Sequence, residues 1–202
     1  MKNLSLYIGL FLLLAKVNVY SQNTADKGSF TFLVQKELGD MNHDKRTDKV
    51  MVEMDLKDNT RPLRVQIFLS QPDKKLQLIV SSTKLIETQY PTYKKGEHNG
   101  NPIPDFFIEE GNLKMLTDIN DRKSSYEFKC KQNDCELNKI SRVIWDGKNT
   151  TTETEIDLVA QTKVEFDQEL GSDKILNKKE KKLKIKSLPK IQDLSFSDLE
   201  QY

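Results

Sequence analysis

The sequence predicts an all-β fold, built mainly from an antiparallel meander that forms an open sheet or a sandwich. Two observations carry this prediction: apolar residues recur at every second position, and short turn signals separate the alternating segments. Alternation with a period of two puts apolar side chains on one face of a strand and charged side chains on the other, as an antiparallel sheet with one solvated face requires.

The expected strands follow one another along the chain. Their apolar positions are Phe30, Phe32 and Val34; Val50, Val52 and Met54; Leu63, Val65, Ile67 and Leu69; Leu76, Leu78 and Val80; Tyr126, Phe128 and Cys130; Ile156 and Leu158; Val164 and Phe166; and Leu183 and Ile185. Turn signals separate them at 57–60, 71–73, 110–112, 132–134 and 146–149.

Three further segments complete the expected organisation. Residues 113–134 predict a strand, a turn at Asn120 and Asp121, and a second strand. Residues 90–104, rich in Pro, Gly and Asn, predict an ordered surface loop. Evidence for helices is thin, although Ser197 to Glu200 fits a capping box.

The first 21 residues have the three parts of a cleavable secretory signal, which leaves residues 22–202 as a single β-rich domain. Lys2 gives a positive start, Leu4 to Ala15 form an apolar run, and Val19 and Ser21 stand at the cleavage site. The run is too short for a membrane span, which needs about 20 apolar residues. An uncleaved anchor is the alternative, because Lys16 interrupts the approach to the cut. We therefore predict a secreted or periplasmic protein with no membrane span.

The charge composition gives no reason to expect a nucleic-acid partner. Without the signal, which holds Lys2 and Lys16, the 32 basic residues of the chain fall to 30, against 31 acidic residues. Lys174 to Lys190 contains eight lysines and is either a solvated edge strand or a patch for nucleic acid or membrane. Alternation of Leu183 and Ile185 with lysines favours the edge strand. We expect a monomer.

Cys130 and Cys135, the two cysteines of the chain, are expected to form a disulfide. A bridge is the default state of such a pair in an oxidising compartment, and this one would brace a hairpin between two strands. Two cysteines are too few for a zinc site, and His43 and His98 have no ligand partner at helical or hairpin spacing.

A cation loop is predicted at residues 40–48. Ca²⁺ takes about six to eight oxygen ligands, and alternate side chains of a tight loop can point inward together. The candidate ligands, at loop positions 1, 3, 5, 7 and 9, are the side chains of Asp40, Asn42, Asp44 and Asp48 and the carbonyl of Arg46. The loop is not an EF-hand, because Met51 stands where the bidentate Glu belongs and a strand is expected to follow. A metal-free turn rich in Asx hydrogen bonds is the alternative.

The segment from Gly39 to Val52 resembles the FG-GAP (VCBS-type) repeat, whose signature is Gly-Asp-Leu-Asn-x-Asp-Gly-x-x-Asp followed by a Val/Ile-rich strand. Looser similarity along residues 63–69, 104–113, 126–128 and 135–137 is to secreted proteins of Bacteroidota that carry a single such loop. The resemblance implies that the loop binds calcium within a propeller-blade-like hairpin. Lys45 replaces the repeat's Gly, and one copy in about 181 residues cannot build a closed propeller.

The function that these observations favour is a non-catalytic binding or interaction domain for a protein or glycan ligand, with a structural calcium loop. We do not expect an enzyme, because the chain has two histidines and no Gly-x-Ser-x-Gly motif, and both cysteines are expected to be oxidised. The alternatives are an inhibitor or immunity protein of a periplasmic enzyme, and a carboxylate-based hydrolase. Asp105, Glu109 and Glu110 are the candidate carboxylates for the hydrolase.

Aromatic residues are candidates for ligand contacts. Trp145 and the segment from Tyr90 to Tyr93 could supply them, as residues on exposed loops often do. Trp145, followed by Asp146 and Gly147, is alternatively the half-buried end of a strand, and this interpretation is favoured.

Overall fold

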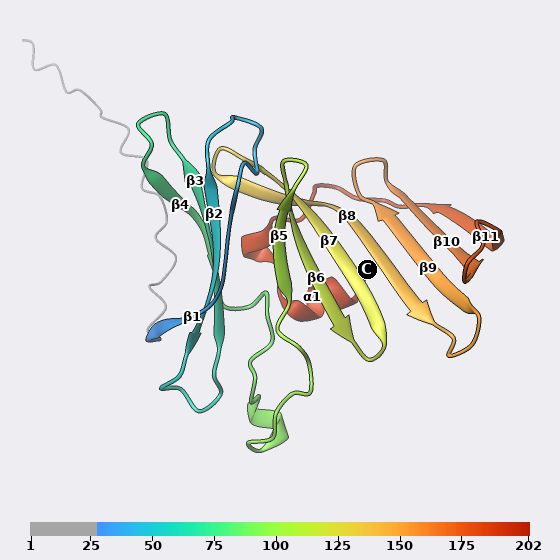
Figure 1. The fold of residues 1–202 in the computed structure, drawn as a ribbon, viewed down its shortest axis with the longest axis horizontal. Helices are drawn as coiled ribbons and strands as arrows, with labels where there is room; N and C mark the ends of the chain where they lie inside the picture. The colour runs from blue at the N-terminus through green and yellow to red at the C-terminus, as the bar shows by residue number, and fades with distance from the viewer. Residues whose placement is uncertain (1–27) are drawn as a thin grey trace, which may run out of the picture.

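The computed structural model describes residues 28–202, which form two antiparallel β-sheets (Figure 1). The predicted signal segment and its cleavage site lie outside the described residues. The four-stranded sheet has the order β1 (Phe30–Gly39), β2 (Asp48–Asp55), β3 (Leu63–Ser70), β4 (Leu76–Ser82). The seven-stranded sheet runs from β5 to β11 in chain order: Asp105–Glu109, Asn112–Ile119, Arg122–Lys131, Asp134–Trp145, Thr150–Asp157, Thr162–Glu169 and Ile175–Lys182. The prediction of an all-β antiparallel meander is confirmed.

The two sheets share one hydrophobic core between their facing sides. Every second residue is buried in β2 and β3, and likewise in β6 and β7, so the alternation read from the sequence becomes a shared interior. The largest fully buried side chains come from both sheets and their connections: Met41, Leu63, Ile67, Leu69, Leu85, Phe106, Leu113, Met115, Tyr126, Phe128, Leu137 and Ile140.

A side-chain amide joins the two sheets where β1 meets β5. Gln35 donates from Nε2 to the Phe106 carbonyl (2.9 Å) and accepts from the Phe106 N–H (3.1 Å), as a neighbouring strand would do. The backbones stay close further along, because an added Cβ on Gly39 would lie 2.8 Å from the Cγ2 atom of Ile108. One pair of backbone groups on the open edge of β5 is thus hydrogen-bonded to β1, although the two strands form no continuous ladder.

The C-terminal segment, residues 183–202, covers the opposite side of the core. It contains η2 (Ile191–Asp193) and the short helix α1 (Phe196–Glu200). The Leu137 N–H donates to the Pro189 carbonyl (2.8 Å), and the Phe196 N–H donates to the Lys84 carbonyl (2.9 Å). The segment is therefore tied both to β8 and to the connection that follows β4.

Two predictions about this segment are corrected by the structure. The last strand, β11, ends at Lys182, so Leu183 and Ile185 do not belong to a strand but pack against the core from an irregular segment. The capping box begins at Ser195, whose side chain accepts from the Asp198 N–H, rather than at Ser197. The physical reason for the first correction is that the chain must leave the sheet to return across the core.

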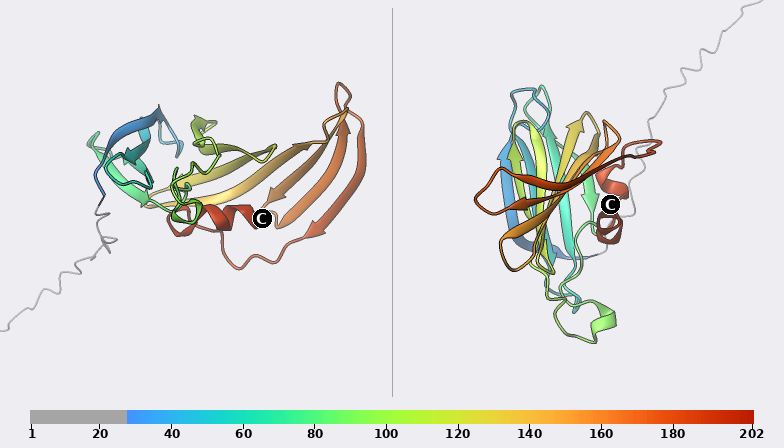
Figure 2. Two further views of the ribbon diagram at one scale, coloured as in Figure 1. Left: turned by 90° about the horizontal axis from the view of Figure 1, so that it is seen from below. Right: turned by 90° about the vertical axis from the view of Figure 1, so that its right-hand side faces the viewer.

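The strands after β8 extend beyond the four-stranded sheet, as the left view of Figure 2 shows. Burial falls with distance from the core: β9 buries Thr151 and Ile156, β10 buries Phe166, and β11 buries no residue. Phe166 lies outside the main core cluster. A lysine-rich edge strand is present, but it is β11 (Ile175–Lys182) and not the segment around Leu183 and Ile185 from which it was predicted.

The predicted hairpins around β7 form as expected. Asn120 and Asp121 both have positive φ (53° and 59°), as a two-residue type I′ turn requires. Cys130 and Cys135 face each other across β7 and β8 with a Cα–Cα distance of 4.0 Å and form a disulfide. The predicted loop at 90–104 is ordered around the one-turn η1 (Thr92–Lys94), and the Asn99 side chain bonds to the Thr88 carbonyl (2.9 Å).

Candidate functional sites

The loop at residues 40–47 joins β1 to β2, which pair antiparallel up to Gly39 and Asp48. Its side-chain oxygens accept hydrogen bonds from the backbone of the loop itself. Asp40 accepts from the N–H groups of Asn42 (3.2 Å), Asp44 (3.1 Å) and Lys45 (2.7 Å). Asn42 accepts from the Asp44 N–H (3.1 Å), and Asp44 accepts from the Arg46 N–H (2.9 Å). These are the Asx-type bonds of a tight turn.

Asp48 closes the loop from inside the fold. It is fully buried, and its two carboxylate oxygens accept from the N–H groups of Met41 (2.9 Å) and Ser70 (2.8 Å). Burial raises the pKa of Asp48, and Asp44 and Asp40 add to the rise, whereas the two N–H groups lower it. At Asp40, partial burial raises the pKa, but the backbone N–H groups that bond to this carboxylate, led by that of Lys45, lower it more. The pKa of Asp40 therefore lies below its usual value.

The guanidinium of Arg46 supplies a positive charge within the loop. It forms an ion pair with Asp44 Oδ2 (2.5 Å), and its Nε donates to the Ser70 carbonyl (2.9 Å). The sequence assigned only the carbonyl of Arg46 to the loop. Within residues 28–202, no three His, Cys, Asp or Glu side chains lie together in an arrangement suited to a metal ion. The structure thus brings the five predicted ligand residues into one loop, with their carboxylates engaged by N–H groups and by Arg46.

Two non-glycine residues of the loop have the left-handed backbone conformation that usually favours glycine. His43 and Lys45 have φ values of 62° and 64°, so the residue at the position of the repeat's Gly is left-handed. The ring of His43 lies over Gly111, where an added Cβ would be 2.1 Å from the ring. Gly111 is therefore required for the contact between this loop and the turn that joins β5 to β6.

The candidate hydrolase carboxylates lie along β5 and in the turn that follows it. Asp105 begins β5 and Glu109 ends it, so their Cα atoms lie about 13 Å apart at the rise of a β-strand. Glu109 forms an ion pair with Lys114 (2.6 Å), and this hydrogen bond raises the pKa of Lys114. Glu110 is exposed in the turn that follows.

A groove with charged walls lies on the solvated face of the seven-stranded sheet, around Trp145. The cross-strand row from Asp118 to Lys123 to Val143 forms one side, and Trp145 follows Val143 on the same face. The groove has a volume of about 580 Å³ and is lined by Asp118, Asp121, Lys123, Val143, Trp145, Gly147, Thr151 and Leu170. Sequence reasoning identified Trp145 but missed the charged residues, although the turn at Asn120 already placed Asp118 opposite Lys123.

The indole of Trp145 is both exposed and fixed. Trp145 is 56% exposed and is the last residue of β8, so the favoured interpretation, a half-buried strand end, agrees with the structure. Its ring lies on the solvated face of the sheet, whereas Arg142, which bonds to the C-terminal segment, points to the other face. Its Nε1 donates to the Lys148 carbonyl (3.0 Å) within a turn that Asp146 holds by accepting from the Lys148 and Thr150 N–H groups. The ring is thereby held in one orientation at the groove.

The charged side chains of the groove have no partners. Among the described residues, no ion pair or hydrogen bond engages the side chains of Asp118, Asp121 or Lys123. All three are exposed. The other aromatic candidates are differently placed: Tyr90 packs edge-on against His98, and Tyr93, 68% exposed, donates to Glu87. Of these aromatic candidates, Trp145 is therefore the one that lies beside charged side chains without ion-pair or hydrogen-bond partners.

Comparison with protein-family models, with curated proteins and with solved structures finds no match to this chain. No helix within residues 28–202 is long and apolar enough to cross a membrane. The functional assignment therefore depends on the geometry of the two sites.

Proposed function

We propose that this chain is a non-catalytic binding domain that acts outside the cytoplasm and takes a glycan ligand in the groove around Trp145. The observation that carries the proposal is an exposed, immobilised indole beside three charged side chains without partners. Ligand sites typically combine an apolar surface with a few polar groups that fix the orientation of the ligand. The Cys130–Cys135 disulfide supports an oxidising compartment.

A sugar ring suits this combination of groups. Its C–H bonds can pack on the indole face, which carries partial negative charge. Its hydroxyls can donate to the carboxylates of Asp118 and Asp121 and accept from the ammonium of Lys123. A protein ligand is the second candidate, favoured by the exposed apolar side chain of Leu170 at the same groove (56% exposed).

In this proposal the loop at 40–48 is structural. Its carboxylate, amide and carbonyl oxygens are the ligand types that Ca²⁺ prefers, and Asp40, Asn42, Asp44, Arg46 and Asp48 would supply them. Since Asp44 is paired with Arg46, the residues fit the ion only once that pair opens. Bound calcium would then fix the β1–β2 hairpin and leave the ligand groove to the other sheet.

Trp145 is the only tryptophan of the chain, so its fluorescence reports directly on the groove. Titration with a panel of soluble oligosaccharides and polysaccharides should shift the emission and protect the indole from acrylamide quenching for those sugars that bind. Asp121→Asn should weaken binding about tenfold, because a sugar hydroxyl would then donate to a neutral amide oxygen instead of a carboxylate. Tyr93→Ala is the matched control, since it removes an exposed aromatic ring away from the groove. Emission that no sugar in the panel changes would refute the glycan assignment.

A further inference from the structure

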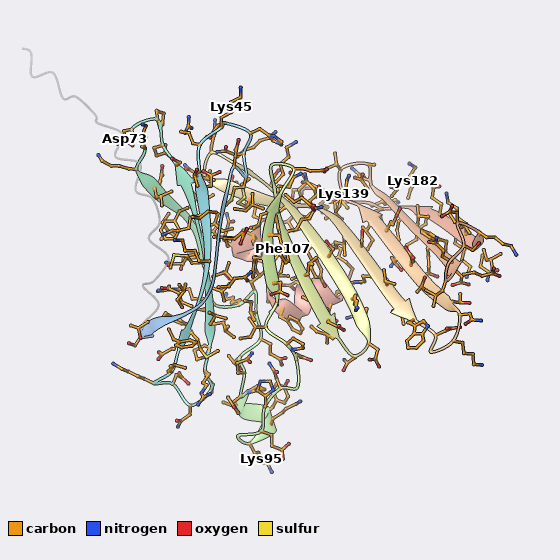
Figure 3. All side chains as sticks on the ribbon, viewed as in Figure 1. Lys45, Asp73, Lys95, Phe107, Lys139 and Lys182 are labelled. Carbon is orange, nitrogen blue, oxygen red and sulfur yellow. A yellow bond between two sulfur atoms is a disulfide. The ribbon has the colours of Figure 1, made fainter. Side chains whose placement is uncertain are left out.

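We propose that one end of the four-stranded sheet is a docking surface for anionic lipid. This tip surface consists of Leu38, Lys45, Arg46, Thr47, Lys49, Phe68, Ser70, Lys74, Leu76 and Leu78. It lies on different strands from the Trp145 groove and does not depend on the function proposed for that groove. Figure 3 shows Lys45 and Asp73, from the loop and from the β3–β4 turn, at the same end of the sheet.

A cross-strand row of apolar side chains, interrupted by Lys49, crosses this surface. Leu38, Lys49, Phe68 and Leu78 are cross-strand partners from β1 to β4, and Leu76 follows on the same face. Three leucines of the row are exposed to similar extents: Leu38 by 50%, Leu76 by 44% and Leu78 by 46%. The ammonium of Lys49 lies over the ring of Phe68, 4.1 Å from its centroid. Leu76 and Leu78 are half exposed on β4, and Leu38 is half exposed on β1 at the opposite edge of the sheet. Together they indicate a surface that a membrane or another molecule covers.

A cationic pocket adjoins this row. Its volume is about 430 Å³, and it is lined by Leu38, Lys45, Arg46, Thr47, Ser70, Lys74 and Leu76. Three of these residues are cations, and no carboxylate lines the pocket. The nearby acids are already engaged, since Asp44 pairs with Arg46 and Asp73 pairs with Lys75 (3.1 Å). Lys45 and Lys74 form no ion pair among the described residues and can meet an anionic headgroup.

The composition of the tip surface favours lipid over an acidic protein. Protein interfaces are depleted in lysine, and their energetically dominant residues are Trp, Tyr and Arg rather than leucine. Lysines that flank protruding leucines are instead typical of segments that insert into the interface of an anionic membrane. The leucines would enter the acyl boundary while Lys45 and Lys74 contact phosphate groups.

The lysines of β11 provide the matched control. There are four of them, against three on the tip surface, but glutamates stand among them: Lys179 faces Glu165 across the strands, and Glu180 follows. The depression beside them is lined by Lys163, Glu165, Lys179, Glu180 and Lys181, with no leucine. If attraction to the vesicle were purely electrostatic, the lysines of β11 and those of the tip surface would contribute equally to binding. If leucines and lysines act together, only the tip surface would bind.

The experiment is sedimentation of the protein with phosphatidylcholine vesicles that do or do not contain phosphatidylglycerol. Binding should require phosphatidylglycerol and weaken with salt. The double variant Lys45→Gln, Lys74→Gln should bind about twenty-five-fold more weakly, about fivefold for each lysine. Leu76→Ser with Leu78→Ser should weaken binding about tenfold. Lys178→Gln with Lys181→Gln should bind like the parent, and melting curves should show that all variants remain folded.

Four results would overturn the proposal. Equal binding to vesicles without phosphatidylglycerol would exclude a role for the cations, and an equal loss in the β11 variant would show non-specific attraction. Retention on polyglutamate without vesicle binding would assign the surface to an acidic protein. Displacement from vesicles by low concentrations of inorganic phosphate would indicate a site for free phosphate. Trp145 fluorescence serves as an independent readout, so failure here leaves the glycan proposal intact.

Discussion

Two hairpins of the same sheet, β7–β8 and β10–β11, are held in different ways. In β7 every second side chain from Ser124 to Cys130 is buried, and β8 continues this pattern with Cys135 and Leu137. In β10–β11 only Phe166 is buried, and charged side chains occupy both faces of β11. The first hairpin is part of the core, while the second is held by its ladder to β9 and by polar contacts such as Asn177 to Asp167 (2.8 Å). Strand pairing alone thus extends the sheet past its core.

Truncation of a leucine in each hairpin should give the largest contrast. Leu137→Ala removes a fully buried side chain and should lower the free energy of unfolding by about 2–5 kcal/mol. Leu176→Ala, in β11, should change it by no more than about 0.5 kcal/mol. Urea denaturation of both variants measures the difference. Equal losses would mean that β10–β11 is covered by something that the described residues do not include.

The next largest effect should come from Arg142, which lies in β8 beneath the C-terminal segment. It is buried, and its guanidinium donates to the carbonyls of Leu199 (2.5 Å) and Tyr202. Arg142→Gln should cost about 1–3 kcal/mol, because it leaves these buried acceptors unsatisfied, and should expose residues 183–202 to protease. Arg122→Gln is the control: it removes a partly exposed ion pair with Glu200, worth at most about 1 kcal/mol. Protease resistance equal to the parent in Arg142→Gln would contradict this account.

The same contrast explains what the sequence could predict. Period-two alternation identified β2, β3 and β7, because their apolar side chains enter a common core. Turn-forming residues identified the turn at Asn120. Leu183 and Ile185 show the same alternation without a strand, since an irregular segment can also turn alternate side chains inward. Alternating apolar residues indicate that one side of a segment is buried. They do not by themselves show that the segment pairs with another strand through backbone hydrogen bonds.

The sites show the same limit at the level of side chains. The sequence placed Asp40 to Asp48 in one loop, but it could not show that the guanidinium of Arg46 turns back onto Asp44, since that depends on the position of Ser70 in β3. Likewise, the groove at Trp145 requires the register of β6, β7 and β8, which a single sequence does not specify.

Reduction of the disulfide should have a smaller effect, confined to β7–β8. The bridge closes a loop with a sequence separation of 5, so its loss should lower the free energy of unfolding by about 2 kcal/mol. The domain should stay folded, because Phe128 and Leu137 remain buried in the core beside it. Intact-mass analysis after alkylation, with and without reductant, checks the bridge itself. Two alkylatable thiols in the native protein would show that the pair is reduced.

Calcium should have the smallest effect, and it should act on the four-stranded sheet while leaving β10–β11 unchanged. Three carboxylates stand in the loop, but Lys45 and Arg46 offset two charges, so a dissociation constant of about 10⁻⁴ M is expected, as in extracellular modules. Millimolar calcium would then stabilise the fold by about 1.4 kcal/mol. Melting curves in calcium and in EDTA measure this gain, and hydrogen exchange should place the added protection at the loop and β1–β2.

Substitutions of two turn aspartates separate a metal site from a hydrogen-bonded turn. Asp44→Ala removes a candidate ligand and should abolish the calcium-dependent rise in melting temperature while leaving the fold intact. Asp58→Ala removes a comparable acceptor, bonded to the Thr60 N–H (2.8 Å), from a turn with no predicted metal, and should keep the rise. If the parent protein melts identically in calcium and in EDTA, the Asx bonds of Asp40 and Asn42 and the ion pair between Asp44 and Arg46 suffice to hold the loop. The guanidinium would then be the only cation that the loop uses.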